Sequence, residues 1–214
     1  MFVPSQYREP DVSWMVDLMR DNPLALMASN GTAADGPYAT HLPVITDPGW
    51  EGPPAADLAG MLLLGHMNRA NPHWSALEDG QTILLTFTGP HAYVSPTVYD
   101  ITPAAPTWNF TSVHVRGTVE KIATTEETLE VVKSTVRAYE KEFGDSWDMN
   151  ASLDYFRKIV PGVGAFHVRV TRAEAMFKLS QEQSPEVRDR VVRSFAGRGC
   201  TRHAQAADLM TRLP

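Results

Sequence analysis

The feature that most constrains this chain is the stretch Met61–Trp74, in which an apolar run passes directly into polar residues. Four apolar residues followed by Gly65 are typical of a buried strand. Asn71 and Pro72 then suit the cap and the first turn of a helix. The stretch therefore brings His66, an arginine and a helix N-terminus to one place. Such a place could bind a ligand that carries an anionic group and that also interacts with an imidazole. The alternative is an ordinary strand–turn–helix, in which the polar residues only cap the helix and face solvent.

The composition is that of an ordinary soluble globular protein, with 43% hydrophobic and 21% charged residues among 214. The formal net charge is −6 without a basic cluster, which argues against specific binding of DNA or another nucleic acid. The single cysteine, Cys200, excludes an intramolecular disulfide and fits a reducing cytoplasm. We find neither a run of 18 apolar residues nor a signal-peptide pattern, so we expect no membrane partner.

Hydrophobic patterning predicts six or seven strands, joined mostly by short turns, with helices outside them. The expected strands cover residues 24–29, 38–45, 61–66, 82–88, 91–96, 111–122 and 164–171, the last extended by 175–179. Gly89-Pro90 is interpreted as a turn between the fourth and the fifth strand. An antiparallel β-barrel with helical additions is the architecture that such a pattern favours.

Helical spacing of apolar residues predicts helices over residues 11–22, 72–77, 125–142, 147–160 and 185–193. Thr125 is the expected cap of the third of these, with two glutamates in its first turn. Residues 196–214 contain Gly197 and Gly199 and are expected to form a flexible tail. We see no linker within residues 1–195, which we therefore expect to form one domain.

Five short motifs, in this order along the chain, resemble those of the PaiB-like family. They are Gly65–Pro72, Gly89–Pro96, Pro106–Phe110, Val113–Gly117 and Lys178–Gln181, and the opening segments Met1–Pro4 and Thr40–Pro43 also fit. The resemblance covers about residues 1–195. It implies the FMN-binding split β-barrel, a mainly β fold with α additions that is usually homodimeric, with cofactor sites at the subunit interface. Members are commonly described as FMN-binding negative transcriptional regulators.

One departure from the usual family pattern concerns the cofactor. The usual pattern has Trp-Tyr and then Lys after Ser-Pro, whereas Ser95-Pro96 is followed here by Thr-Val-Tyr-Asp-Ile-Thr. A flavin phosphate needs cationic or backbone donors, so the missing lysine disfavours FMN. This version of the motifs is similar to the piperazate synthase branch, whose members are haem proteins of peptide natural-product pathways. The resemblance implies haem b and the conversion of N5-hydroxy-L-ornithine to L-piperazic acid by N–N bond formation.

A haem needs an axial side chain, most simply a neutral histidine. Among the seven histidines, His41 and His66 both lie in expected strands within the family motifs. His66 ends an apolar strand beside Arg69, so we predict that it is the metal ligand. A structural hydrogen bond is the expected role of His41, and a purely structural role is also the alternative for His66.

The remaining candidate residues each have a structural alternative. Arg69 could pair with a haem propionate or a substrate carboxylate, or form a surface salt bridge. Trp108 could wall a planar cofactor or anchor its loop. Tyr93 and Ser95 share one face of an expected strand and could donate hydrogen bonds to the ligand. The full assignment is catalytic roles for Tyr93 and Lys178, and cofactor-binding roles for His66, Arg69, Asn71, Ser95 and Trp108.

The implied reaction is redox-neutral, because the α-amine displaces the N5 hydroxyl and water leaves. Iron would polarise the N–O bond as a Lewis acid, the α-ammonium must first lose a proton, and a cavity would hold the two nitrogens together. The chain has no Gly-rich dinucleotide fingerprint, which fits a reaction without NAD(P)H. Two alternatives remain: an FMN-containing regulator, and a flavin or haem oxidoreductase that would need a reductant.

Overall fold

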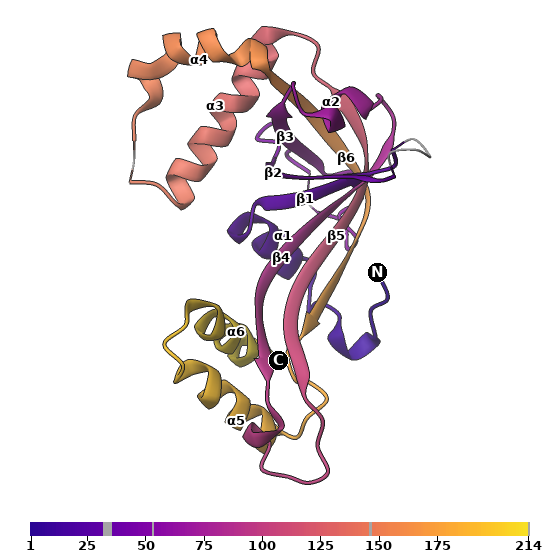
Figure 1. Ribbon diagram of the computed structural model, residues 1–214, viewed down its shortest axis with the longest axis vertical. Helices are drawn as coiled ribbons and strands as arrows, with labels where there is room; N and C mark the ends of the chain where they lie inside the picture. Colours follow the sequence, from indigo (N-terminus) through magenta and orange to yellow (C-terminus); the bar gives the residue numbers. More distant parts are fainter. Residues whose placement is uncertain (32–35, 53, 146, 214) are drawn as a thin grey trace. The chain divides into compact units, whose positions relative to one another are not determined.

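The computed structural model describes residues 1–31, 36–52, 54–145 and 147–213 (Figure 1). Its strands are β1 (Leu24–Ser29), β2 (Tyr38–Thr46), β3 (Leu62–Asn68), β4 (Thr82–Val94), β5 (Thr107–Lys121) and β6 (Val163–Lys178). They form a closed barrel in the order β1-β2-β3-β6-β5-β4. The pairings of β1 with β2 and β4, and of β3 with β2 and β6, are antiparallel. The barrel that the sequence predicts is confirmed.

Helical segments follow the order expected from the sequence, with differences at their ends. They are α1 (Val12–Asp21), α2 (Pro72–Ala76), α3 (Thr125–Glu142), α4 (Leu153–Ile159), α5 (Pro185–Ala196) and α6 (Thr201–Arg212), with short 3-10 turns η1 (Ser5–Tyr7), η2 (Pro96–Val98), η3 (Met149–Ser152) and η4 (Val160–Gly162). The cap of α3 is Thr124, one residue before the expected Thr125. The Thr124 hydroxyl accepts from the Glu127 backbone N–H and donates to its carboxylate, which satisfies the first turn. The expected helix over 147–160 is shorter, because 3-10 turns flank α4.

The described chain divides into two compact units, which we consider separately. The barrel unit consists of Met19–Phe87 and His114–Ala173. The terminal unit consists of Met1–Leu18, Thr88–Val113 and Glu174–Pro214. Strands β4, β5 and β6 contribute residues to both units, so continuous strands rather than a linker join them.

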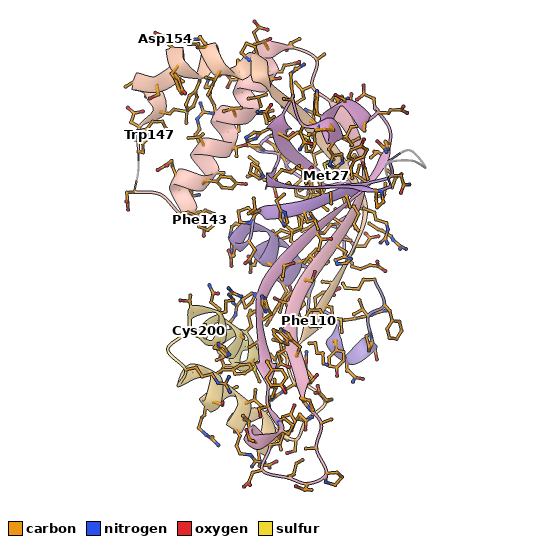
Figure 2. All side chains as sticks on the ribbon, in the orientation of Figure 1. Met27, Phe110, Phe143, Trp147, Asp154 and Cys200 are labelled. Atoms are coloured by element: carbon orange, nitrogen blue, oxygen red, sulfur yellow. The ribbon has the colours of Figure 1, made fainter. Side chains whose placement is uncertain are left out.

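Inside the barrel unit, β3 and β6 pack closely around an aromatic side chain. Phe166 is fully buried and lies opposite Gly65 in the register of the two strands. A Cβ atom on Gly65 would lie 2.6 Å from the Phe166 ring, so this position requires glycine. Met27 of β1 is also fully buried in this unit (Figure 2). The glycine that ends the apolar run of β3 therefore makes room for a core ring.

A second, smaller apolar cluster lies on the outer face of the same strands. It contains Leu64, Ile122, Val131 and Ala165, with Ile45 packed against it. Val131 belongs to α3, which contacts β2 and β3. The cluster explains why Leu64 is buried although its neighbours Leu63 and Gly65 point to the barrel interior, since successive strand residues face opposite sides.

Strand β4 of the terminal unit corrects the expectation of two strands separated by a turn. A Cβ atom on Gly89 would lie 2.4 Å from Thr111 Oγ1, and the Thr111 hydroxyl donates to the Pro90 carbonyl over 3.2 Å. Close packing on β5 thus keeps the chain extended through Gly89-Pro90. The predicted turn is wrong because this contact, distant in sequence, outweighs the local preference of the two residues.

The C-terminal stretch forms helix α6 instead of the flexible tail that we expected. Ala206 and Met210, four residues apart and so on one helical face, are both buried. Helix α6 packs on α5, whose Phe195 is also buried. The Asn109 side chain reaches this helix, with Nδ2 lying 3.6 Å from Met210 Sδ. Cys200, just before α6, is free and exposed (Figure 2).

Candidate functional site

A cavity opens in the barrel unit at the point where β2 and β3 stop pairing. The pairing of these strands ends with Val44 opposite Gly65, whereas β3 stays paired with β6 as far as Asn68 opposite Val163. The cavity has a volume of about 560 Å³, which is within the range of small-molecule sites. Its lining comes from both separated strands, from Asn71 and from residues near η4: Thr40, His41, Leu42, Pro43, His66, Met67, Asn68, Asn71, Ile159, Gly162 and Val163.

His66 lies on the wall of this cavity, two residues before the end of β3. It pairs with Ala165 of β6, on the face that carries the outer apolar cluster. Its Nδ1 atom is buried and has no hydrogen-bond partner within the described part of the chain. Burial lowers the pKa of the His66 imidazole, because desolvation disfavours the charged ring. The ring is therefore held neutral, the state in which histidine can bind a metal.

His41 lies on the opposite side of the cavity, on β2. Its side chain is exposed. The structural hydrogen bond that the sequence predicted for His41 stays a prediction, and the structure places this residue on the cavity lining, where it can face a bound molecule. The cavity thus offers two imidazoles of different character, since His66 is largely desolvated and its pKa is lowered, whereas the His41 side chain is exposed.

Asn71 has the capping role that the sequence predicts, and it also lines the cavity. Its Oδ1 accepts from the backbone N–H of His73 over 3.0 Å, which starts α2. Its Nδ2 donates to Thr40 Oγ1 over 3.2 Å. Sequence reasoning overlooked Thr40, since its partners are 31 and 33 residues away along the chain.

Arg69 is fixed at the edge of the barrel unit rather than in the cavity lining. Its Nε donates to the Val163 carbonyl over 2.8 Å, and its guanidinium carbon lies 5.6 Å from the centre of the Trp74 ring. The first contact attaches the turn after β3 to the start of β6, and the second holds the Arg69 side chain against α2. The predicted pairing of Arg69 with a propionate or carboxylate stays a prediction.

The terminal unit contains a second group of predicted residues, which includes a small aromatic cluster. The Tyr93 and Trp108 rings have centroids 5.9 Å apart, and Trp108 Nε1 donates to His91 Nδ1 over 3.3 Å. Tyr93 is 43% exposed and Trp108 is 49% exposed. An exposed pair of aromatic rings of this size is free to contact a partner or a ligand.

The other two predicted residues of the terminal unit have local partners. The Ser95 hydroxyl accepts from the Thr97 backbone N–H and so caps η2. Lys178 Nζ lies 2.5 Å from Thr107 Oγ1 and 5.8 Å from the centre of the Tyr7 ring. The Gln181 side chain accepts from Leu179 and donates to Phe177, which closes the turn after β6. The structure therefore brings together His66 with Asn71, and Tyr93 with Trp108, each within its own unit.

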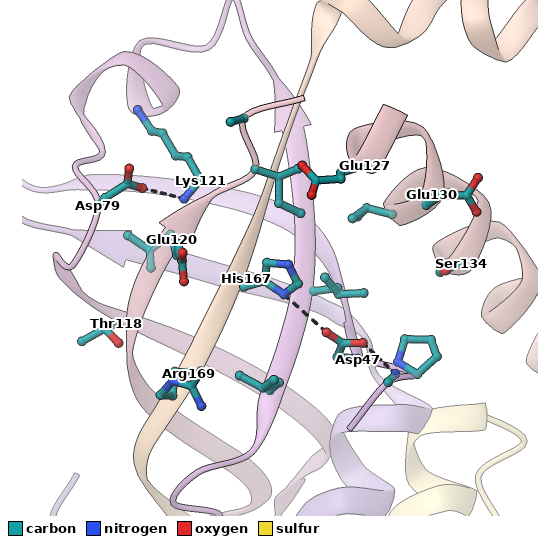
Figure 3. Close-up of a pocket in the computed structure, with 18 of the residues that line it drawn as sticks. Asp47, Asp79, Thr118, Glu120, Lys121, Glu127, Glu130, Ser134, His167 and Arg169 are labelled. Atoms are coloured by element: carbon teal, nitrogen blue, oxygen red, sulfur yellow. Dashed lines mark hydrogen bonds and ion pairs between the residues drawn. The ribbon is translucent and has the colours of Figure 1, made fainter. Parts of the chain in front are cut away.

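A larger cavity of about 1270 Å³ lies in the barrel unit between α3 and the sheet (Figure 3). His167 and Asp47 face each other there, with His167 Nδ1 lying 3.4 Å from Asp47 Oδ2. Several carboxylates around it already have local partners: Asp79 accepts from the Lys121 backbone N–H, Glu127 belongs to the cap of α3, and Glu130 pairs with Lys133. These carboxylates already have hydrogen-bond or ion-pair partners nearby in the protein. The larger cavity is therefore a weaker candidate for a cofactor site than the cavity lined by the largely buried His66.

No cluster of three or more His, Cys, Asp or Glu side chains suited to a bare metal ion occurs among the described residues. A haem differs in this respect, because the porphyrin supplies four of the iron's ligands and the protein can supply one. Within the same residues, no helix has the length and apolar character needed to span a membrane.

Comparison with a family of known sequences gives a match over most of the chain. The family is described as "Putative FMN-binding domain", and it matches residues 1–172. The protein of Bacillus subtilis (strain 168) called protease synthase and sporulation protein PAI 2 is 26% identical over 212 residues, which cover 98% of this chain and 96% of that protein.

Solved structures share the fold at low sequence identity. The FAD and heme binding protein from Mycobacterium smegmatis has a TM-score of 0.57 at 15% identity, covering 86% of this chain and 78% of that chain. The flavocytochrome Anf3 from Azotobacter vinelandii has a TM-score of 0.52 at 18% identity, covering 80% of this chain and 69% of that chain. These likenesses confirm the fold.

Proposed function

This chain belongs to the family described as "Putative FMN-binding domain", and we propose that it is a haem-dependent member that converts N5-hydroxy-L-ornithine to L-piperazic acid. The observation that carries the proposal is His66, which lines a cavity of about 560 Å³ and whose Nδ1 is buried without a hydrogen-bond partner among the described residues. A buried polar atom without a partner calls for one that the chain does not supply. A neutral imidazole is the simplest protein ligand of haem iron.

The cavity lining favours haem over FMN at this place. No lysine or arginine occurs among the described residues that line it. The phosphate of FMN would need such cationic donors or a set of backbone N–H groups. If haem is the cofactor, His66 would hold its iron and Arg69 would offer a cationic partner for a haem carboxylate. The name of the M. smegmatis neighbour, a FAD and heme binding protein, supports the view that this fold accommodates a haem.

The proposed reaction balances without an oxidant or a reductant. The α-nitrogen forms a bond to N5, the N5–O bond breaks, and the departing hydroxide combines with one proton from the α-nitrogen to leave as water. When bound, haem would supply a Lewis-acidic iron that polarises the N–O bond. The chain contributes a cavity that holds the flexible substrate with its two nitrogens together, which removes much of the entropic cost of ring closure.

The substrate is a zwitterion, so its carboxylate and amine also need partners from the protein. We propose Arg69 for this role, because it belongs to the same unit as His66. For Tyr93 and Lys178, which belong to the terminal unit, a catalytic role stays a prediction from the motif resemblance. Asn71 would contact the cofactor from the cavity wall, and cofactor contacts of Ser95 and Trp108 in the terminal unit stay a prediction. In this assignment His66 would hold the haem iron, which would act on the substrate as a Lewis acid.

We also propose that the protein acts as a homodimer. The exposed Tyr93 and Trp108 rings of the terminal unit provide an apolar surface that a second copy could cover. Light scattering of the purified protein should give about twice the mass of the 23.7 kDa chain. A mass of one chain at micromolar concentration would contradict the proposal.

Two measurements test the cofactor and the activity separately. The purified, haem-loaded protein should show a Soret band and, without any added reductant, should convert N5-hydroxy-L-ornithine to a product lighter by one water. Mass spectrometry and comparison with authentic L-piperazic acid identify that product. A haem-loaded protein that leaves the substrate unchanged would contradict the activity, and dependence on a reductant would favour an oxidoreductase.

The second candidate function is that of an FMN-binding regulator. The family description and the similarity to the B. subtilis sporulation protein favour it. In that case the purified protein should show flavin absorption bands and no Soret band. Sequence-dependent DNA binding at physiological salt would also support a regulator, although the net charge of −6 speaks against it.

A further inference from the structure

A buried imidazole, His73, lies between two hydroxyl groups beside the His66 cavity. His73 is 1% exposed. Its Nε2 lies 2.9 Å from Ser29 Oγ, and its Nδ1 lies 2.9 Å from Thr40 Oγ1. The ring also stacks on Tyr38, with centroids 5.4 Å apart. His73 is thus connected on both sides by hydrogen bonds although it is closed off from water.

The orientation of the neighbouring Asn71 amide sets the direction of this chain of hydrogen bonds. Asn71 Oδ1 accepts from the backbone N–H of His73, so the amide nitrogen must be the atom directed at Thr40. Thr40 Oγ1 accepts that hydrogen bond and keeps one hydrogen and one lone pair. The hydrogen can go to His73 Nδ1, in which case Nε2 carries the ring hydrogen and donates to Ser29.

Thr40 and Asn71 both line the cavity that contains His66. The hydrogen-bonded chain therefore begins at the cavity wall and ends in the protein interior. Burial lowers the pKa of His73. Its side-chain partners are two hydroxyls and the Tyr38 ring. In the tautomer that carries the ring hydrogen on Nε2, His73 is a neutral base whose acceptor nitrogen Nδ1 is directed at Thr40.

We propose that Thr40 and His73 form a proton relay for the cavity, in which Thr40 receives a proton from the substrate α-nitrogen while passing its own to His73 Nδ1. This inference rests on the proposed function. As the N–N bond forms and the N5–O bond breaks, the α-nitrogen loses one proton to the relay, and the relay returns one proton to the departing hydroxide. Thr40 would touch the substrate, and His73 acts through Thr40.

The same contacts could serve only to fix α2 against β1 and β2, so the test must separate a relay from a structural link. Thr40→Val keeps the size of the side chain and removes the hydroxyl, while Thr40→Ser keeps the hydroxyl. Thr46→Val is the matched control, since Thr46 is exposed at the other end of β2 and lies outside the cavity.

In haem-loaded enzyme, Thr40→Val should lower kcat by about 100-fold or more, the usual contribution of proton transfer by a side chain. KM should change little, Thr40→Ser should recover most of the rate, and Thr46→Val should match the wild type. A solvent deuterium isotope effect on kcat should be present in the wild type and in Thr40→Ser. Equal kcat values for Thr40→Val and the wild type would overturn the relay while leaving the proposed function intact.

A nitrogen-15 NMR measurement on the haem-free protein provides a readout that does not depend on turnover. The wild type should show His73 with its ring hydrogen on Nε2 and with Nδ1 accepting a hydrogen bond, and Thr40→Val should shift only the Nδ1 resonance. Added L-ornithine, which cannot cyclise, should shift that resonance in the wild type and in Thr40→Ser. An Nδ1 resonance that is identical in the wild type and in Thr40→Val would overturn the relay. If the wild type makes no product, the proposed function fails, and with it the role of the relay in this reaction.

Discussion

His66→Ala is expected to release the haem and to abolish the formation of piperazic acid. The substitution removes an imidazole that lines the cavity and whose buried Nδ1 has no hydrogen-bond partner in the described part of the chain. Loss of a residue that merely orients a metal ligand costs about 10–100-fold in metal affinity, so loss of the ligand itself should cost more. The Soret absorbance per mole of protein, measured after gel filtration, reports the loss directly.

The control for this experiment is His41→Ala, which removes the other imidazole of the same cavity. His41 is exposed, so its replacement should disturb neither folding nor the bond from His66 to iron. The variant should keep its haem and its spectrum. If His41→Ala loses the haem while His66→Ala retains the wild-type spectrum and rate, then His41 is the ligand and the assignment of His66 is wrong.

Much of the barrel could be predicted from the sequence, because it depends on local alternation of apolar and polar residues. Strand β1 has the bounds expected for it, Leu24–Ser29. The cap of α2 was also predictable, since the His73 backbone N–H that donates to Asn71 is only two residues away. Gly89-Pro90 could not be interpreted correctly, because the contact that keeps it extended comes from Thr111 on another strand.

The candidate site was only partly predictable for the same reason. The motif around His66 predicted that β3 contributes to the site, but it gave no indication of where β2 and β3 stop pairing. The relay depends on His73 meeting Ser29 and Thr40, which are 44 and 33 residues away. Arg69 likewise contacts a carbonyl 94 residues away. A fixed spacing along the chain carries no information about such contacts, so the sequence gives no signal for them.

The C-terminal stretch contains a helical pattern of apolar residues, although we expected it to be flexible. Ala206 and Met210 have helical spacing, but two glycines precede them and suggest disorder. Their burial in α6 requires the apolar face of α5, which is visible in the sequence only as a separate helix. Stability of this kind comes from packing between helices rather than from either helix alone.

Phe166→Ala is expected to destabilise the protein by about 3–5 kcal/mol, the usual cost of removing a phenyl ring from a packed core. Phe166 is fully buried and sits opposite Gly65, the position where a Cβ atom would come within 2.6 Å of its ring. Since a domain is typically stable by only about 5–15 kcal/mol, this single change should remove a large part of the stability. Urea unfolding followed by circular dichroism gives the free energy of unfolding.

The same contact makes a second substitution informative. Gly65→Ala in the wild type should cost about 1–3 kcal/mol, because its methyl group overlaps the Phe166 ring at 2.6 Å. In the Phe166→Ala background the ring is gone and the methyl group partly fills the space. Gly65→Ala should then cost less, with an interaction energy within the range of about 0.5–3 kcal/mol seen for residues in contact. Additive effects of the two substitutions would show that Gly65 is not constrained by the ring. The glycine before His66 would then have to be explained by the cavity side of β3 rather than by the core.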